Sequence, residues 1–295
     1  MSGVTNLENI LAQGKLALLC EGPAVCGTDL SGLASFAGSV KSLATAVLTP
    51  DNPGASVAVS GLAAARTVLD AGAEPVLTMS TRDRNRMALQ ADLLGAGALG
   101  VKNIFCVTGV HPSRGDQAQS QRVYDLDAAQ WIAAANEISR SKKLMNGKEV
   151  GGSTGFFLGA AANPFVKTPE LHLAVTKNKV AAGAKFIITT PVCDAKAFEA
   201  WLAAAQKKGA LAGASLIASV IVIKDAETAA RLAASRRGIN VPETVMKSLT
   251  DAKAGMAFCL AQIKAIKGLK GIAGINISAP GCEELIPEVL SQAGK

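Results

Sequence analysis

Glu21 is the first of several polar side chains that directly follow apolar runs in this 295-residue chain. It comes after LALLC (16–20), a run that is typical of a buried strand. A carboxylate at the end of such a strand is poorly solvated, which favours its protonated form and suits a general acid. An ion pair between Glu21 and a Lys or Arg on a neighbouring loop explains the position equally well, and spacing alone leaves both open.

Other polar residues follow the later apolar runs, so a fold that gathers strand ends would bring them together with Glu21. Such a site would surround a small ligand with hydroxyl, amide and carboxylate groups. On spacing alone, TPDNP (49–53) is typical of a turn, and Lys179, four residues before Gly183, is typical of a solvated helix face. The strand-end residues are Thr49, Asp51, Asn52, Thr81, Arg82, Asp83, Thr108, Asn163, Thr190, Lys224, Asn276 and Ser278.

The stretch STRDRNR (80–86) is the densest charge cluster at the end of an apolar run. Its arginines carry planar donor groups of the kind that bind anions. We predict that Asp83 caps the helix that follows, because a carboxylate accepts hydrogen bonds from the first free backbone N–H groups. Arg84 and Arg86 are expected to form ion pairs on the surface or between strands.

The apolar runs themselves predict the fold class, because each is short and nearly continuously apolar, as parallel strands covered on both faces are. Helical stretches such as 57–73 separate them, and many end at Gly. This alternation indicates a single (β/α)8 TIM barrel over 1–295, with its site at the C-terminal mouth of the strands. The predicted strands are 15–22, 44–53, 74–83, 102–110, 154–164, 185–194, 215–225 and 271–281.

A doubly wound open sheet is the alternative fold, but CEGPAVCG (20–27) lacks the G-x-G-x-x-G phosphate turn that such sheets usually carry. No Pro/Gly/Ser-rich linker divides the chain, so we expect one domain.

The amino-acid composition and charge of the chain exclude several classes of function. The net charge is +7 without a Lys/Arg block, and the basic runs at 139–144 and 235–238 are expected to end helices. Aromatic residues make up 4% of the chain, which leaves too few to stack single-stranded nucleic acid. Neither a signal-peptide pattern nor a membrane-spanning run is visible, so we expect a soluble, cytoplasmic protein. The six cysteines form no C-x-x-C pair, and we expect buried thiols and no metal site.

Together these segments resemble the methylenetetrahydrofolate reductase family, over about residues 5–290. The most specific segment, GAEPVLTMSTRDRNRMALQADLLGAGALGVKNIFCVTG (72–109), is similar to the short, microbial branch of that family. Shorter matches in the same order are TPDNP (49–53), YDLDAAQ (124–130), FFLGAAANPF (156–165), KVAAGAKFIITTPVCD (179–194) and APGCEELIPE (279–288).

The resemblance implies a barrel that binds FAD at its mouth and reduces 5,10-methylenetetrahydrofolate to 5-methyltetrahydrofolate. Glu21 then matches the family's general acid, which protonates a folate nitrogen as the imidazolidine ring opens. Thr49 matches a threonine that contacts the flavin. The positions that hold the flavin's adenine, ribose and phosphates are Tyr124, Asp127, Asn163 and Lys179, and for Lys179 this replaces the solvated helix face. We further expect Thr190, Asn276 and Ser278 to contact folate, and Asp51, Asn52, Thr81, Thr108 and Val110 to line the cofactor.

Two departures from the family pattern fall at the predicted centre of the reaction. Where the family carries an aspartate after Thr-Gly or Arg-Gly, this chain reads Thr108-Gly109-Val110. Where the family carries Thr-Gln, this chain reads Thr189-Thr190, and Cys193 stands where a bulky residue is common. A preorganised polar group of this kind commonly contributes about 3–4 kcal/mol to a transition state, so its loss suggests altered chemistry.

Three functions follow as hypotheses. The first is a flavin-dependent methylenetetrahydrofolate reductase whose electron donor need not be NAD(P)H. The second is a flavin-independent methyltransferase that moves a methyl group between tetrahydrofolate and a corrinoid (methylcobalamin) protein, as in anaerobic O-demethylation. The third is a non-catalytic folate-binding subunit. The expected partners are a folate, a corrinoid or electron-donor protein and a second copy of the chain.

Overall fold

The computed structural model describes residues 4–234, 239 and 241–294 of the chain. Eight parallel strands close into a barrel in chain order, and β1 pairs with β8 as well as with β2. This closure confirms the predicted (β/α)8 barrel and excludes the open sheet. The strands are β1 (Ala17–Glu21), β2 (Ala46–Thr49), β3 (Pro75–Ser80), β4 (Asn103–Val107), β5 (Phe157–Ala162), β6 (Phe186–Thr189), β7 (Ser215–Ile221) and β8 (Ile272–Ser278).

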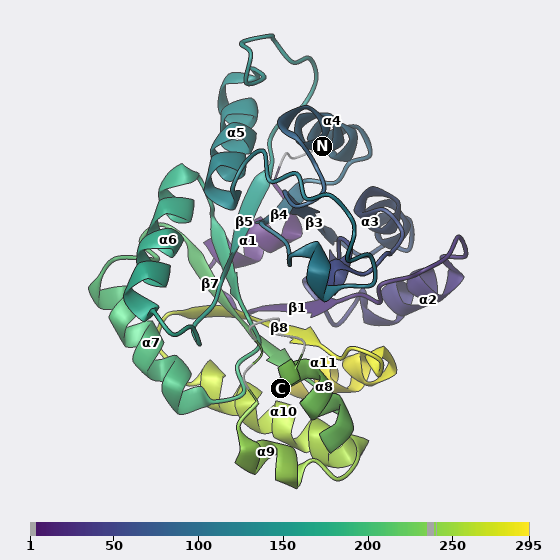
Figure 1. Cartoon of the computed structure of the whole chain (residues 1–295), viewed down its shortest axis with the longest axis vertical. Coiled ribbons are helices and arrows are strands. Elements are labelled where there is room, and N and C mark those ends of the chain that lie inside the picture. The colour runs from purple at the N-terminus through teal and green to yellow at the C-terminus, as the bar shows by residue number, and fades with distance from the viewer. Residues whose placement is uncertain (1–3, 235–238, 240, 295) are drawn as a thin grey trace.

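Helices surround the strands, as Figure 1 shows. None of the helices in the described part of the chain is long and apolar enough to cross a membrane. The α-helices are α1 (Asn6–Ala12), α2 (Ser31–Val40), α3 (Gly61–Asp70), α4 (Arg86–Ala98), α5 (Ala128–Ser141), α6 (Pro169–Ala182), α7 (Ala195–Lys207), α8 (Ala226–Ala234), α9 (Glu243–Ser248), α10 (Ala252–Lys267) and α11 (Ile286–Ala293). Three short 3-10 helices are η1 (Pro53–Ala55), η2 (Pro112–Arg114) and η3 (Glu283–Leu285).

Aromatic rings fill the half of the barrel toward the N-terminal ends of the strands. Phe186 stacks against Phe157, with ring centroids 5.2 Å apart, and against Phe105 at 6.5 Å. Gly159 makes room for this stack, because a Cβ there would lie 2.1 Å from the Phe186 ring. Because this half is filled, space for a ligand remains only toward the C-terminal ends of the strands.

Helix α1 covers the opposite, N-terminal end of the barrel. Leu7 and Leu11 are buried among the inward-facing residues of the strands. The backbone N–H groups of Asn6 and Leu7 donate to the carboxylate of Glu74 at 2.6 and 2.8 Å, which satisfies two of the free N–H groups at the start of α1. This end of the barrel is therefore closed.

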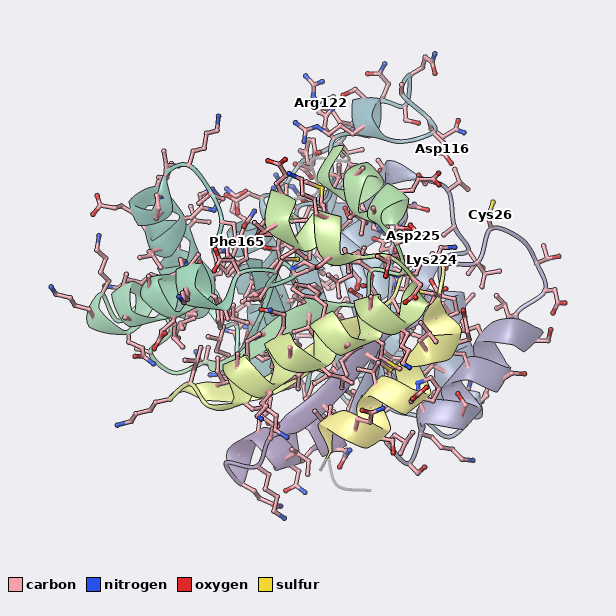
Figure 2. All side chains as sticks on the ribbon, turned by 90° about the horizontal axis from the view of Figure 1, so that it is seen from below. Cys26, Asp116, Arg122, Phe165, Lys224 and Asp225 are labelled. Atoms are coloured by element: carbon pink, nitrogen blue, oxygen red, sulfur yellow. The ribbon has the colours of Figure 1, made fainter. Side chains whose placement is uncertain are left out.

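The loops that follow the strands lie on one side of the molecule. Figure 2 shows Cys26 after β1, Asp116 after β4, Phe165 after β5, and Lys224 after β7 on that same side. This is the mouth at which enzymes of this architecture bind their ligands.

The helix cap predicted at Asp83 is wrong. Asn85 caps α4, and its side-chain oxygen accepts hydrogen bonds from the N–H groups of Met87 and Ala88 at 3.1 and 3.0 Å. Asp83 lies too far before the helix and pairs with Arg82 instead.

Other local expectations have mixed outcomes. The basic run at 139–144 does end a helix, since Arg140 lies in the last turn of α5, whereas 235–238 lies outside the described residues. All six cysteines are free thiols. Five are buried as expected, but Cys26 is exposed, because it stands in the loop after β1 and not in a strand.

Candidate functional site

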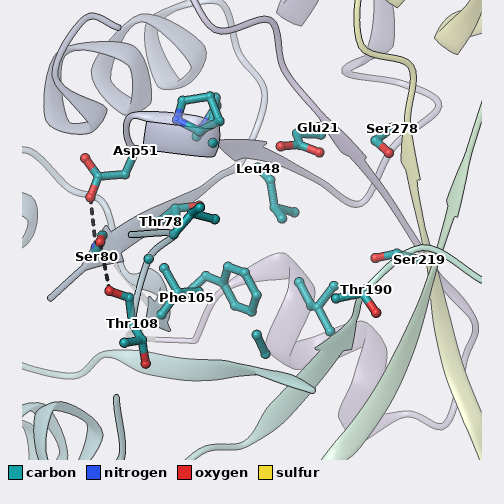
Figure 3. Close-up of a pocket in the computed structure, with 18 of the residues that line it drawn as sticks. Glu21, Leu48, Asp51, Thr78, Ser80, Phe105, Thr108, Thr190, Ser219 and Ser278 are labelled. Atoms are coloured by element: carbon teal, nitrogen blue, oxygen red, sulfur yellow. Dashed lines mark hydrogen bonds between the residues drawn. The ribbon is translucent and has the colours of Figure 1, made fainter. Parts of the chain in front are cut away.

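A cavity of about 390 Å³ opens at the C-terminal ends of the strands, and we call it the first cavity. Every strand or the loop after it contributes to its lining. Successive strand residues face opposite sides, so Thr78 and Ser80 of β3 both face inward, as does Ser278 of β8 (Figure 3). Asn276, two residues before Ser278, also lines the cavity. The polar residues at the mouth stand above an apolar floor that includes Leu48, Phe105 and Ile188.

Glu21 ends β1 and lines this cavity close to Ser278 of the neighbouring strand β8 (Figure 3). Cys20, directly before it, faces away into the core and is fully buried. Burial, together with the nearby negative charge of Glu21, raises the pKa of the Cys20 thiol. The titratable group that β1 presents to the cavity is thus a carboxylate.

The loop that carries Val110 is docked tightly onto the end of β3. Gly109 has a φ of +86°, and a Cβ there would lie 2.3 Å from Ser80 Oγ. That hydroxyl donates to the Thr108 carbonyl at 3.3 Å. Only glycine fits both the backbone conformation and the space. Val110 consequently lines the first cavity with an apolar side chain at the end of β4.

Arg82 joins three segments of the mouth. Its side chain is 3% exposed, and its guanidinium donates to the carbonyls of Val110 at 3.2 Å and Asn52 at 3.3 Å. It also forms a two-point pair with the carboxylate of Asp83, at 2.7 and 2.5 Å. The loops after β2 and β4 are therefore both held by one side chain from the loop after β3.

Asp51 has a structural role beneath this network. Its carboxylate accepts the Ser80 N–H at 2.8 Å and pairs with Arg84 at 2.6 Å, and Arg84 also binds Asp92 at 2.7 Å. Burial alone would lower the pKa of Arg84, but the two carboxylates raise it overall. The pairing expected for Arg84 is confirmed between loops, and that for Arg86 at the surface with Asp125.

A second cavity of about 360 Å³ adjoins the first, and we call it the side cavity. The two share Thr108, Ala161, Lys179 and Thr190. Lys179 Nζ donates to the Ala161 carbonyl at 2.7 Å, and burial lowers the pKa of the amine while Asp127 partly offsets the shift. Lys179 is thus a half-buried cation at the junction of the two cavities, and the solvated helix face favoured by spacing is wrong.

Asn163 and Asp127 also line the side cavity. The Thr190 hydroxyl donates to Asn163 Oδ1 at 3.1 Å, which ties the ends of β5 and β6 together. Asp127 is the N-cap of α5 and accepts the Gln130 N–H at 2.7 Å.

A third cavity of about 350 Å³ adjoins the first on the other side of Glu21. We call it the acidic cavity, because Glu21 and Glu283 are the charged residues among the described residues that line it. Glu21 and Ser278 belong to both the first and the acidic cavity.

Three predicted site residues line none of these cavities. Thr49 and Thr81 are fully buried on the side of the strands that faces the helices. The Thr49 hydroxyl donates to the Val76 carbonyl at 3.4 Å, and that of Thr81 has no hydrogen-bond partner. Tyr124 lies near Arg82, and burial raises the pKa of its phenol.

Conversely, the cavity lining includes residues that our sequence reasoning left out of the site. They face inward because they alternate with outward-facing neighbours, and lone hydroxyls within apolar runs were the available signal. These residues are Thr78, Ser80, Phe105 and Ser219.

Several solved structures share the fold. One is an uncharacterized protein from Clostridium thermocellum that binds two copies of 5-methyl-5,6,7,8-tetrahydrofolic acid, with 12% identity over 98% of each chain and a TM-score of 0.67. Another is 2,3-dimethylmalate lyase, with 13% identity over 99% of this chain and 85% of that one and a TM-score of 0.55. Phosphonopyruvate hydrolase has 10% identity over 98% and 85%, with a TM-score of 0.54. At these identities the likeness concerns the fold alone.

Comparison of sequences is more specific. No sequence among curated proteins matches the chain. The family model described as methylenetetrahydrofolate reductase matches residues 38–294, which span β2 to β8 and most of the residues lining the mouth. The chain belongs to the methylenetetrahydrofolate reductase family.

Proposed function

We propose that this protein is a folate-dependent one-carbon enzyme that binds a reduced folate at the barrel mouth, with Glu21 as its proton donor and acceptor. The observation that carries the proposal is the position of Glu21, a carboxylate at the mouth that lines two adjoining cavities. The family supports it, as does the Clostridium thermocellum protein of the same fold that binds 5-methyltetrahydrofolate.

The reaction we propose first is reduction of 5,10-methylenetetrahydrofolate to 5-methyltetrahydrofolate. Glu21 donates a proton to a folate nitrogen as the carbon–nitrogen bond of the imidazolidine ring breaks. The carboxylate lines the first cavity, where it can reach a nitrogen of a bound folate. FAD, when bound, supplies the hydride.

The residues present fit FAD. The first cavity offers an apolar floor for a planar ring, and the adjoining side cavity offers room for the rest of a dinucleotide. Lys179 stands at the junction of the two, where its ammonium group would hold the pyrophosphate. It is the one Lys or Arg among the described residues that line the side cavity. Asp127 and Asn163 would bind the ribose and adenine.

Methyl transfer between tetrahydrofolate and a corrinoid protein is the second candidate. The observation that favours it is the apolar wall at the end of β4, where Val107 and Val110 both line the first cavity. A carboxylate that tunes a flavin ring is therefore missing from this wall. In methyl transfer, the methyl group passes between folate N5 and cobalt, and Glu21 exchanges the proton at N5.

The absorption spectrum of the purified protein separates the candidates. Bound yellow flavin that is bleached by reductant and reoxidised by methylenetetrahydrofolate would support the reductase and exclude flavin-independent methyl transfer. Colourless protein that binds tetrahydrofolate and demethylates methylcobalamin would exclude the reductase. Protein that binds folate without either turnover would indicate the non-catalytic subunit.

Substitution Glu21→Gln tests the role of the carboxylate in either reaction. General acid–base catalysis commonly contributes about 10²–10⁴-fold, so turnover should fall in that range while folate binding persists. Unchanged turnover in Glu21→Gln would show that another group moves the proton.

A further inference from the structure

Two polar side chains on neighbouring strands form a buried pair in the wall of the first cavity. Ser219 of β7 and Asn276 of β8 are register partners, and both line this cavity. Ser219 is 3% exposed and Asn276 is 4% exposed. The Asn276 amide nitrogen donates to Ser219 Oγ at 3.1 Å. Neither residue lines the side cavity or the acidic cavity, so the pair belongs to the first cavity.

Ser219 carries a hydroxyl donor that the fold does not use. Its backbone N–H donates to Thr189 Oγ1 at 3.0 Å, and its Oγ accepts the hydrogen bond from Asn276. A serine hydroxyl can also donate one hydrogen bond, and none of the described residues accepts it. Figure 3 shows the Ser219 side chain pointing from β7 into the cavity. The hydroxyl hydrogen is therefore available to an acceptor on a ligand.

Asn276 supplies a second, independent sign of a ligand. Its amide oxygen is buried without a hydrogen-bond partner. A buried acceptor without a partner is costly, so the residue is poorly suited to a purely structural role. Its amide nitrogen, however, occupies one side of Ser219 Oγ and so directs the hydroxyl hydrogen away from β8. The pair is therefore better explained by a ligand than by the stability of the barrel.

The place of the pair in the barrel indicates which part of the ligand it meets. The side cavity, which we propose holds the rest of a flavin dinucleotide, joins the first cavity at the ends of β4, β5 and β6, through residues that include Thr108, Ala161 and Thr190. The pair lies on β7 and β8, and β8 neighbours β1, which ends at Glu21. The proposed proton transfer places the folate imidazolidine ring at Glu21. Because this ring is fused to the pterin, the pterin is the ring system nearest the pair.

We propose that Ser219 holds the folate by donating its hydroxyl to an acceptor of the pterin ring, with Asn276 as the positioning residue that orients this hydroxyl. A reduced pterin offers a carbonyl oxygen and ring nitrogens as acceptors. This inference rests on the proposed folate function and deepens it, because it assigns the pterin to the β7–β8 wall of the first cavity. It holds for hydride transfer and for methyl transfer alike.

Substitution Ser219→Ala in the full chain tests the contact, and the fold should persist because the change removes a single oxygen atom. The probe is 5-methyltetrahydrofolate in equilibrium binding. The dissociation constant should rise about three- to ten-fold, the loss expected for one hydrogen bond between uncharged groups. Ser215→Ala is the matched control, because Ser215 begins the same strand and lines none of the three cavities at the mouth.

Substitution Asn276→Leu tests whether the amide acts through the hydroxyl. Loss of the unpartnered oxygen should offset loss of the bond to Ser219, so thermal melts should stay close to those of the wild type. Affinity should fall about as far as in Ser219→Ala, and the double variant should lose no more than either single variant. Asn103→Leu is the matched control, because its amide oxygen is also buried without a partner but lies at the start of β4, at the opposite end of the barrel.

A second probe, 5-methyltetrahydropteroate, lacks the glutamate and separates the pterin from the tail. Ser219→Ala should weaken the binding of this probe by the same factor. Wild-type affinity of Ser219→Ala for the pteroate, together with a loss for the folate, would place the acceptor on the glutamate and overturn the assignment.

The outcomes separate this inference from the proposed function. Weaker binding in Ser219→Ala and Asn276→Leu that is not additive, with both controls unchanged, supports the pterin contact. Wild-type affinity in Ser219→Ala overturns it and leaves the folate function standing, as does an equal loss in Ser215→Ala. Losses that add in full overturn the positioning role of Asn276. A wild-type protein that binds no 5-methyltetrahydrofolate overturns the proposed function and this inference with it.

Discussion

Replacing Arg82 with methionine would remove the side chain that joins three loops of the mouth. The guanidinium donates to the carbonyls of Asn52 and Val110 and pairs with Asp83. Methionine keeps an apolar stem of similar length, so the packing along the side chain is largely preserved. The effect of the substitution should therefore report the polar contacts.

These contacts determine how far the free energy of unfolding should fall in Arg82→Met. Two hydrogen bonds from a charged donor contribute about 1.5–3 kcal/mol each, and the pair with Asp83, which is 33% exposed, adds about 0–1 kcal/mol. Because water at the mouth can reach part of this network, we expect the free energy of unfolding to fall by about 3 kcal/mol. The loops that hold Asn52 and Val110 line the first cavity, so ligand affinity should fall as well.

Chemical denaturation followed by tryptophan fluorescence measures this loss, since Trp131 and Trp201 are buried at 0% and 5% exposure. The matched control is Arg86→Met, which breaks an arginine–aspartate pair in which Arg86 is 54% exposed and should cost less than about 1 kcal/mol. If the two variants lose equal stability, Arg82 does not organise the mouth and the reasoning is refuted.

Three further changes test other parts of the site. Val110→Asp restores the carboxylate common in the family and should raise reductase turnover by up to about 10²–10³-fold, whereas an unchanged steady-state rate would show that the valine is not limiting. Gly109→Ala should lower the unfolding free energy by more than Gly14→Ala, because both residues have positive φ but only the Gly109 methyl meets Ser80. Thermal melts that rank the two the other way would contradict the clash. Burial lowers the pKa of Lys179, so the affinity for an anionic dinucleotide should fall as pH rises through that lowered value. Binding titrations of the Lys179→Met variant at the same pH values should show no such fall. If the variant and the wild type have the same pH profile, the anion binds elsewhere.

The order of strands was readable from the sequence because parallel strands in a barrel are buried on both faces. Such strands appear as short, continuously apolar runs, and all eight observed strands fall within the predicted ranges. The same property hides which residues face inward. Thr78 and Ser80 face the cavity whereas Thr49 and Thr81 face the helices, so a hydroxyl within an apolar run indicates a candidate residue but not the side of the strand that it faces.

Contacts between loops also could not be predicted from the sequence. Asp83 and Asn85 can both cap a helix by residue type, but α4 begins at Arg86, so Asn85 is the capping residue and Asp83 pairs with Arg82 instead. The spacing of Lys179 predicted a solvated helix face. The sequence could not show otherwise, because the burial that lowers the pKa of Lys179 comes from neighbouring elements of the mouth.

The sequence by itself determined the barrel, the family and the presence of Glu21 and Val110 at strand ends, because these depend on local patterns of apolar and polar residues. Only the tertiary structure decided that Glu21 stands between two cavities, that Lys179 joins the first cavity to the side cavity, and that Arg82 holds the loops around them. The physical reason is that a cavity is bounded by side chains from many strands, and their relative phase and contacts arise when the barrel closes.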